Sequence, residues 1–431
     1  MAVGTARKVI RAARLIDGTG AAPRTNVAIV VSGTKIASIE PWREELRAGA
    51  TVYEYPVETV LPGLVDAHCH LSLLGAGLRY EEEIPHSNEF MAVTAVYNAQ
   101  VMLKSGVTTL RDNGCRDSIM FGVRDAMDRG LLVGPRMLIA GRPVTMTGGH
   151  FSWCNGTADG DDEIWREIRK LVQEGADHIK IMASGGGTEG TNPGLPSYTA
   201  AELRIAVTAA HHYGRLTTAH CRATQAVANA VEAGLDSIEH AEFNGPGDLI
   251  EHLAEGPNHK PAWDEEVAKR LADSGTYASL TLPGSGYAAF SLLRDKLDRE
   301  GSAALTPAER TELERGELAQ EGRAENVRRL LGLGMLPRIV VSSDAGPFDI
   351  EFGKLWQGLE VAVAGGMSTM QALQASTYTA AKSCGVLDKV GTLEVGKEAD
   401  VLVVEANPLD NVRNLRDVVA VFKAGERVVG A

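Results

Sequence analysis

Cysteine is scarce in this chain of 431 residues, which has five cysteines and no Cys-x-x-Cys pair. They are Cys69, Cys115, Cys154, Cys221 and Cys384. An odd number of widely separated thiols argues against a disulfide framework and against a thiolate zinc cluster. We expect reduced thiols, most of them buried.

Basic residues and long apolar runs are also in short supply. There are 43 Lys and Arg against 56 Asp and Glu, a formal net charge of -13 and a pI near 5.4. Nucleic-acid binding needs clustered cations, so small-molecule chemistry is favoured. No apolar run approaches the roughly 18 residues of a transmembrane helix, and the first residues resemble no secretory signal. We therefore expect a cytoplasmic homo-oligomer that acts on a small molecule, without nucleic-acid or membrane partners.

Short strands with turn signals between them are present at both ends of the chain. We expect the two ends to pair into one small β-sandwich domain formed by residues 1–60 and 386–431. The strands read from the sequence are residues 9–16, 26–31, 35–39, 399–405 and 418–423.

Between these ends, over residues 61–385, strands alternate with helical sequence and glycine. Eight such units predict an α/β fold, a closed (β/α)8 TIM barrel whose active site lies at the carboxyl ends of the strands. Two loops are unusually long, residues 141–160 and 283–310, and loops of this length at a barrel mouth often act as lids. The second is helix-prone and charged, and it is equally compatible with a solvated insertion. The eight strands are residues 64–70, 107–112, 136–140, 177–183, 215–220, 236–240, 276–281 and 338–344.

The first barrel strand ends in two histidines one residue apart, His68 and His70. Alternate side chains of a strand share a face, so both imidazoles point the same way. Such a pair is half of a metal site, although two histidines at a strand end can also satisfy backbone groups.

Further candidate ligands end other predicted strands: Lys180, His220, His240 and Asp344. Four of the eleven histidines thus fall at three strand ends, which packing alone does not explain. The alternative for His220 and His240 is a capped core histidine, and for Asp344 the N-cap of a turn. Glu239 is expected to face outward by strand alternation.

Lys180 is expected to project into the barrel, because its neighbours Ile179 and Ile181 face the helices. An unpaired ammonium there would cost several kcal/mol, and metal ions beside it would raise that cost.

These residues resemble the binuclear, metal-dependent subtype of the amidohydrolase superfamily. The likeness runs from Pro62-Gly63-x-x-Asp66-x-His68-x-His70 to the closing Gly391-Thr-Leu-Glu-Val-Gly-Lys-Glu-Ala-Asp400 segment. It implies two divalent metal ions, with zinc favoured: one on His68, His70 and Asp344, the other on His220 and His240. It also implies an N6-carboxylysine at Lys180 that bridges the ions. Hydrolysis of an amide C–N bond by a metal-bridging hydroxide would then follow, with Asp344 as general base and acid.

The sequence Thr145-Met-Thr-Gly-Gly-His150 is similar to a loop of one branch of that superfamily. The branch contains Xaa-Pro dipeptidases, carboxypeptidases that act on N-acyl amino acids, and hydrolases of ochratoxin and aryl amides. The resemblance implies that His150 binds the scissile carbonyl. A substrate carboxylate would need a cation or a hydroxyl, and Arg222 and the loop Ser184–Thr188 are our candidates; Arg222 could equally pair with a surface acid.

Other readings stay open. A cyclic-amide hydrolase or a deaminase, including an imidazolonepropionase-like enzyme, could use the same barrel, although Lys180 argues against a mononuclear deaminase. A non-catalytic scaffold that has lost its metals is disfavoured by the six intact ligand candidates.

Overall fold

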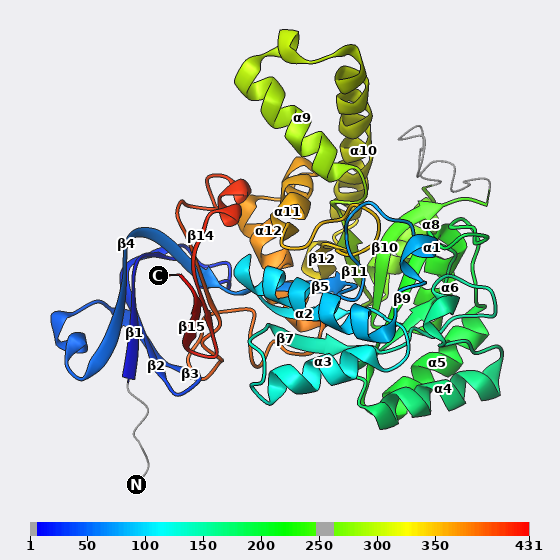
Figure 1. Ribbon diagram of the computed structural model, residues 1–431, viewed down its shortest axis with the longest axis horizontal. Helices are drawn as coiled ribbons and strands as arrows, with labels where there is room; N and C mark the ends of the chain where they lie inside the picture. Colours follow the sequence, from blue (N-terminus) through cyan, green and yellow to red (C-terminus); the bar gives the residue numbers. More distant parts are fainter. Residues whose placement is uncertain (1–6, 247–262, 431) are drawn as a thin grey trace.

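The computed structural model describes residues 7–246 and 263–430 (Figure 1). The protein is an α/β fold with one mixed sheet of seven strands and two parallel sheets of five and three strands. Within the two described ranges, no helix combines the length and the apolar character that crossing a membrane requires.

The seven-stranded sheet combines strands from both ends of the chain, at the left of Figure 1. Its strand order is β15-β14-β13-β4-β1-β2-β3, and β13 pairs antiparallel with β4. The strands are β1 (Arg7–Leu15), β2 (Arg24–Ser32), β3 (Lys35–Pro41), β4 (Ala50–Pro62), β13 (Val401–Val404), β14 (Val418–Lys423) and β15 (Glu426–Val429).

This sheet is continuous and curls toward itself, whereas the sequence predicted a sandwich. The backbone N–H of Ile36 donates to the carbonyl of Lys397 at 2.9 Å, and that of Ala399 to the carbonyl of Thr34 at 2.8 Å. The β2–β3 hairpin therefore reaches the chain just before β13. Apolar side chains from both ends fill the interior, among them Ile29 and Phe422.

The parallel strands follow one another in chain order. The three-stranded sheet has the order β5-β6-β7 and the five-stranded sheet β12-β11-β10-β9-β8. Isolated parallel bridges connect the two sheets, between Val144 and Ile181 and between Cys69 and Ala345. The strands are β5 (Leu64–Cys69), β6 (Val107–Asp112), β7 (Arg136–Ile139), β8 (His178–Met182), β9 (Leu216–Ala223), β10 (Ser237–Asn244), β11 (Tyr277–Thr281) and β12 (Ile339–Ser342).

Helices cover the parallel strands and end where the sequence has stop signals. The expected capping box opens α5, where Thr199 accepts from the backbone N–H of Glu202, and Gly234 ends α6 in the left-handed region at φ 82°. The helices are α1 (Tyr80–Glu83), α2 (Asn88–Lys104), α3 (Ile119–Asp128), α4 (Asp161–Glu174), α5 (Ala200–His212), α6 (Thr224–Ala233), α8 (Glu265–Asp273), α9 (Tyr287–Glu300), α10 (Pro307–Gly332), α11 (Leu355–Ala364), α12 (Thr369–Ala375) and α13 (Tyr378–Ser383).

Most of the segment 283–310, a long connection with a helix-prone sequence, is helical. It contains α9 and the start of α10, which begins at Pro307 behind a capping box formed by Thr306 and Glu309. The two helices form a hairpin that projects from the rest of the molecule at the top of Figure 1.

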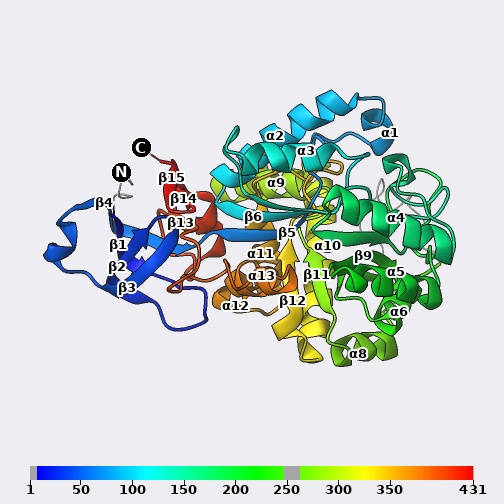
Figure 2. The ribbon, with the colours of Figure 1, turned by 90° about the horizontal axis from the view of Figure 1, so that it is seen from below.

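Strand β4 of the seven-stranded sheet continues almost directly into β5, the first parallel strand, because Gly63 alone separates them (Figure 2). A β-carbon at Gly63 would overlap the side chain of Thr108 on β6. Glycine is therefore required for the close approach of these two strands.

Candidate metal centre

His68, His70 and Asp344 converge at one edge of the parallel strands. His68 is the last residue but one of β5, His70 follows that strand directly, and Asp344 follows β12. Nε2 of His68 lies 3.2 Å from Nε2 of His70 and 3.2 Å from Oδ1 of Asp344. The three side chains are buried, and one ligand atom from each lies within 4.8 Å of the others. The structure thus contains a possible His-His-Asp metal site.

The outer nitrogens of these two imidazoles are held by acceptors. Nδ1–H of His68 donates to Oε2 of Glu239 at 2.8 Å, and Nδ1–H of His70 donates to the carbonyl of Gly114 at 3.0 Å. We assign the tautomers from these partners. Both Nε2 atoms then carry lone pairs, as required for metal ligation.

His220 on β9 and His240 on β10 form a second pair. Nδ1 of His220 faces Nε2 of His240 at 2.9 Å, while Nε2–H of His220 donates to the carbonyl of Gly185 at 3.0 Å. The rings of His240 and His68 lie 5.1 Å apart, centroid to centroid. The four histidines are therefore one group, and burial lowers the pKa of His70, His220 and His240 well below the usual value.

Lys180 on β8 is completely buried, and its Nζ has no hydrogen-bond partner within the described residues. Burial lowers its pKa to about 8, although the carboxylates of Glu239 and Asp344 oppose that shift. A neutral amine is thus accessible near neutral pH, as expected for a reactive lysine.

Asp344 has a buried Oδ1 without a hydrogen-bond partner. Burial raises the pKa of this carboxyl group, and His68 and Arg222 oppose the rise. An unpartnered carboxylate oxygen, an unpartnered amine and two pairs of facing ring nitrogens form a donor set suited to divalent cations. The residues present therefore fit the metal ions that the sequence implied.

Glu239 contradicts the prediction from strand alternation. Its side chain is fully buried beside the histidines, where it receives hydrogen bonds from His68, Thr218 and Arg111. It occupies an inward position opposite His220, and the backbone of His240 then turns into the left-handed region at φ 69°. Two consecutive side chains consequently point inward, which regular alternation does not allow.

Arg111 on β6 is a second residue that sequence reasoning missed. Its guanidinium is buried and donates to Oε1 of Glu239 at 2.7 Å and to the carbonyl of Ala67 at 2.8 Å. Burial raises the pKa of Glu239, but His68 and Arg111 outweigh it and hold the pKa well below the usual range. The detectable signal was an arginine directly after the uncharged residues Val107-Thr-Thr-Leu110 of a predicted strand.

His150 lies next to the histidine group, with its ring 4.6 Å from that of His220. The Oγ1 of Thr188 lies 2.8 Å from Nδ1 of His150, and the backbone N–H of Thr188 donates to the same atom at 3.4 Å. Nδ1 is therefore an acceptor, so Nε2 carries the proton. Burial lowers the pKa of His150 well below the usual value, which leaves a neutral ring with one donor.

The side chain of Arg222 also extends to the candidate metal site, where its Nη2 lies 3.9 Å from Oδ2 of Asp344. Its Nη1 donates to Glu242 at the end of β10, and its backbone N–H donates to Oγ of Ser184 at 3.0 Å. The loop Ser184–Thr188 therefore supports both His150 and Arg222. The six ligand candidates, His150 and Arg222 all gather at one site.

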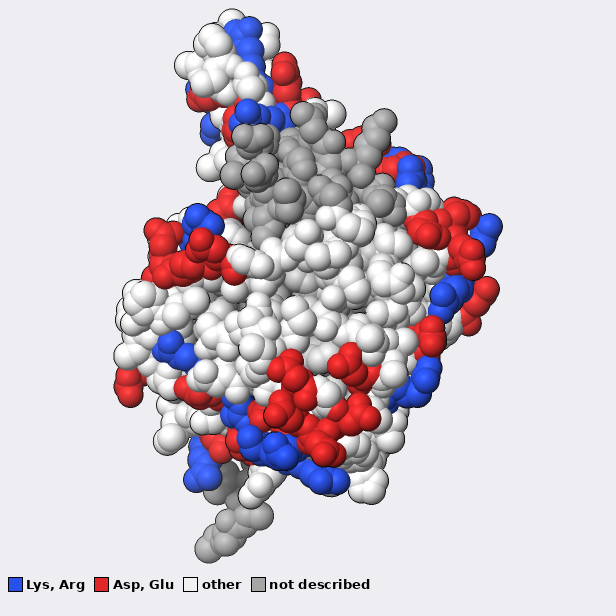
Figure 3. Space-filling model, turned by 90° about the vertical axis from the view of Figure 1, so that its right-hand side faces the viewer, with Lys and Arg blue, Asp and Glu red and all other residues white. Residues whose placement is uncertain are grey.

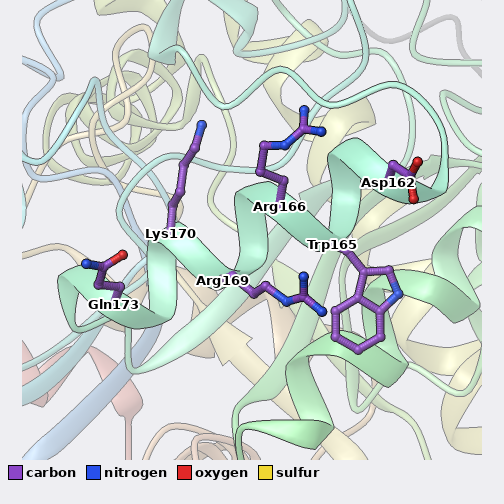
Figure 4. Close-up of a pocket in the computed structure, with 6 residues that line it drawn as sticks. All are labelled: Asp162, Trp165, Arg166, Arg169, Lys170 and Gln173. Atoms are coloured by element: carbon purple, nitrogen blue, oxygen red, sulfur yellow. The ribbon is translucent and has the colours of Figure 1, made fainter.

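A surface depression is also present along α4 (Figure 4). All its lining residues belong to that single helix, and none is a candidate site residue, so we assign it no catalytic role. They are Asp162, Trp165, Arg166, Arg169, Lys170 and Gln173. On the face that Figure 3 shows, basic and acidic side chains are intermixed around a broad uncharged area.

Comparison with known proteins gives consistent matches along the chain. The model of the amidohydrolase family matches residues 59–428. The ochratoxinase of Aspergillus niger is 26% identical in an alignment that covers 98% of this chain and 86% of that protein.

Two solved structures support the same assignment. A Xaa-Pro dipeptidase crystallised with methionine in its active site has a TM-score of 0.80 and 28% identity, covering 98% of this chain and all of that one. The putative prolidase from Bifidobacterium longum has a TM-score of 0.74 and 26% identity, covering 98% and 94%. The chain therefore belongs to the amidohydrolase family, and it is a hydrolytic enzyme that acts on amide bonds.

Proposed function

We propose that this protein is a binuclear metal-dependent hydrolase that cleaves the amide bond of a dipeptide, an N-acyl amino acid or a related aryl amide. The observation that carries the proposal is the meeting of two facing histidine pairs with the unpartnered Lys180 and Asp344. The similarity to an ochratoxinase and to a Xaa-Pro dipeptidase supports this substrate class.

We further propose that the eight parallel strands close into a (β/α)8 barrel. The isolated bridges at both borders of the two parallel sheets support closure. The carboxyl ends of the strands would then form one mouth, with the candidate site inside it.

One ion would be held by His68, His70 and Asp344, and the other by His220 and His240. Lys180 in its neutral form would add carbon dioxide, with loss of a proton, and the resulting carbamate would bridge both ions. Zinc suits these imidazole and carboxylate ligands. Bound ions of this kind polarise a carbonyl group and lower the pKa of water.

The protein's own groups then have distinct tasks. Asp344 would accept a proton from the attacking water and deliver it to the leaving nitrogen. His150 would donate its Nε2–H to the oxygen of the scissile carbonyl. A guanidinium group beside the site would bind a carboxylate group of the substrate, and Arg222 is the candidate from the sequence.

Metal analysis combined with a substrate panel tests this function. We expect about two ions per chain and hydrolysis of at least one member of a panel of dipeptides, N-acyl amino acids and aryl amides. Metal-loaded enzyme that cleaves none of them but opens a lactam ring would contradict the proposal.

A further inference from the structure

Arg323, on α10, is half-buried and has no direct ion pair with any described residue. Its Nη1 is buried without a hydrogen-bond partner among those residues. Burial lowers its pKa, and although Glu242 opposes that effect, Arg222 adds to it. A buried guanidinium nitrogen without a partner costs free energy, so Nη1 of Arg323 points to a ligand.

The acidic groups that influence Arg323 are already bound by other residues. Glu242 receives a hydrogen bond from the guanidinium of Arg222. Asp349 accepts from the hydroxyl of Ser285 at 2.6 Å and from the backbone N–H of Gly286 at 3.0 Å. These carboxylates are therefore satisfied, whereas Arg323 is not.

The guanidinium of Arg323 is also positioned by the loop after β11. It packs directly on Gly284, where a β-carbon would overlap it. Gly284 has φ +63°, a backbone conformation that favours glycine. Helix α10 is also tied to β10, because Nδ2 of Asn326 donates to the carbonyl of Ala241 at 2.9 Å, so α10 places a cation beside the carboxyl end of β10.

The connection to the catalytic group runs through Arg222. Its Nη2 lies 3.9 Å from Asp344, while its Nη1 is bound by Glu242. Arg222 therefore has two acidic neighbours within the protein, and Arg323 is the guanidinium with free donors.

We propose that Arg323 is the cation that binds a carboxylate of the amide substrate, and that Arg222, neutralised by Glu242, positions Asp344. This inference rests on the proposed function and restricts it to anionic amides. The carboxylate is the α-carboxylate of the leaving amino acid or an acidic group elsewhere on the substrate. A guanidinium fork matches either one in bidentate geometry.

Binding of an uncleavable probe tests this without turnover. Titration calorimetry would compare 3-phenylpropanoate with its uncharged amide, 3-phenylpropanamide, on metal-loaded protein. We expect the carboxylate to bind the natural protein roughly ten- to a hundredfold more tightly. Arg323→Gln should remove that preference, and Arg323→Lys should restore part of it.

Arg328→Gln is the matched control, because Arg328 lies on the same helix, is exposed and pairs with Glu325. Arg328→Gln should leave the preference for the carboxylate over its amide unchanged. Gly284→Ala should reduce the preference by displacing the guanidinium. An undiminished preference in Arg323→Gln would overturn the proposal, as would equal losses in Arg323→Gln and Arg328→Gln.

Kinetics then identify the source of the carboxylate. If it is the α-carboxylate, Arg323→Gln raises KM for N-acetylphenylalanine but not for N-acetylphenylalanine amide. If it is a side-chain group, the rise appears with the α-amide of N-acetylglutamate. Normal probe binding without hydrolysis of any amide would refute the proposed function alone, so the two failures are distinguishable.

Discussion

Glu239 holds His68 through a hydrogen bond of 2.8 Å between Oε2 and Nδ1. The same carboxylate is fixed on its other side by Arg111, at 2.7 Å. The orientation of the first candidate ligand is therefore set by a buried ion pair between β6 and β10.

Replacing Glu239 with Gln should weaken metal binding. The substitution removes the negative charge that makes the His68 imidazole a better ligand, and such changes lower metal affinity about 10- to 100-fold. Competition with a chelator would measure the affinity. Unaltered affinity in Glu239→Gln would show that this contact does not support the metal site.

Replacing Lys180 with Ala should reduce the metal content from about two ions per chain to one or fewer, because the bridging group is lost. Elemental analysis would measure the content. Lys170→Ala is the control, since Lys170 is exposed on α4 and pairs with Glu167. If Lys180→Ala retained both ions and its full rate, the binuclear proposal would be wrong.

Replacing His150 with Ala should lower kcat by about two to three orders of magnitude while the metal content stays constant. The substitution removes the donor to the carbonyl oxygen but replaces none of the candidate metal ligands. Thr188→Val should have a smaller effect, because it removes only the hydroxyl next to Nδ1 of His150. A kcat equal to that of the natural enzyme would assign the carbonyl contact to another group.

Replacing Arg111 with Met should destabilise the metal-free protein by about 3–5 kcal/mol, because Glu239 is left as an unpaired buried charge. Denaturant unfolding after chelator treatment would measure this. The double variant Arg111→Met, Glu239→Gln should recover part of the loss. If the stability loss of the double variant equalled the sum of the losses of the two single variants, Arg111 and Glu239 would not be directly coupled.

Glu83 should make the stability dependent on pH. Burial raises its pKa to about 7, although the backbone N–H of Leu74 donates to it at 2.9 Å and opposes the shift. The folded pKa exceeds the unfolded value of about 4.3, so the protonated form favours folding. Its stabilising effect is complete below about pH 4 and is lost as the pH rises to about 7.

Glu83→Gln cannot titrate, so its stability relative to the natural protein should increase over that pH window and stay constant above it. The gain should be on the order of 1–3 kcal/mol. Unfolding midpoints at several pH values would measure it, with the exposed Glu317→Gln as control. A difference independent of pH would disprove the role of Glu83.

Much of the site could be predicted because strand periodicity and strand ends are visible in the sequence. His68 and His70 share a face by alternation, and parallel strands carry Lys180 and His220 to the same edge. These local rules hold over regular backbone. They identified the six ligand candidates at the strand ends, whereas His150 was identified by the resemblance of its loop to that of a known family.

The orientation of Glu239 could not be predicted, since it depends on a left-handed residue at His240. Nothing in Ile238-Glu-His-Ala marks that conformation, which tertiary packing imposes. Arg323 was missed for a related reason, because its significance comes from unsatisfied donors in the folded state. The start of α10 was not predicted, although Thr306-Pro-Ala-Glu309 carries its signal, a capping box with proline at the first helical position.

The junction at Gly63 links the seven-stranded sheet to the strand that bears His68. A bulkier residue there would push β5 away from Thr108, and the displacement would travel five residues along a stiff extended segment to the first imidazole. A substitution at this distant position would then weaken the binding of metal ions although every ligand residue is unchanged.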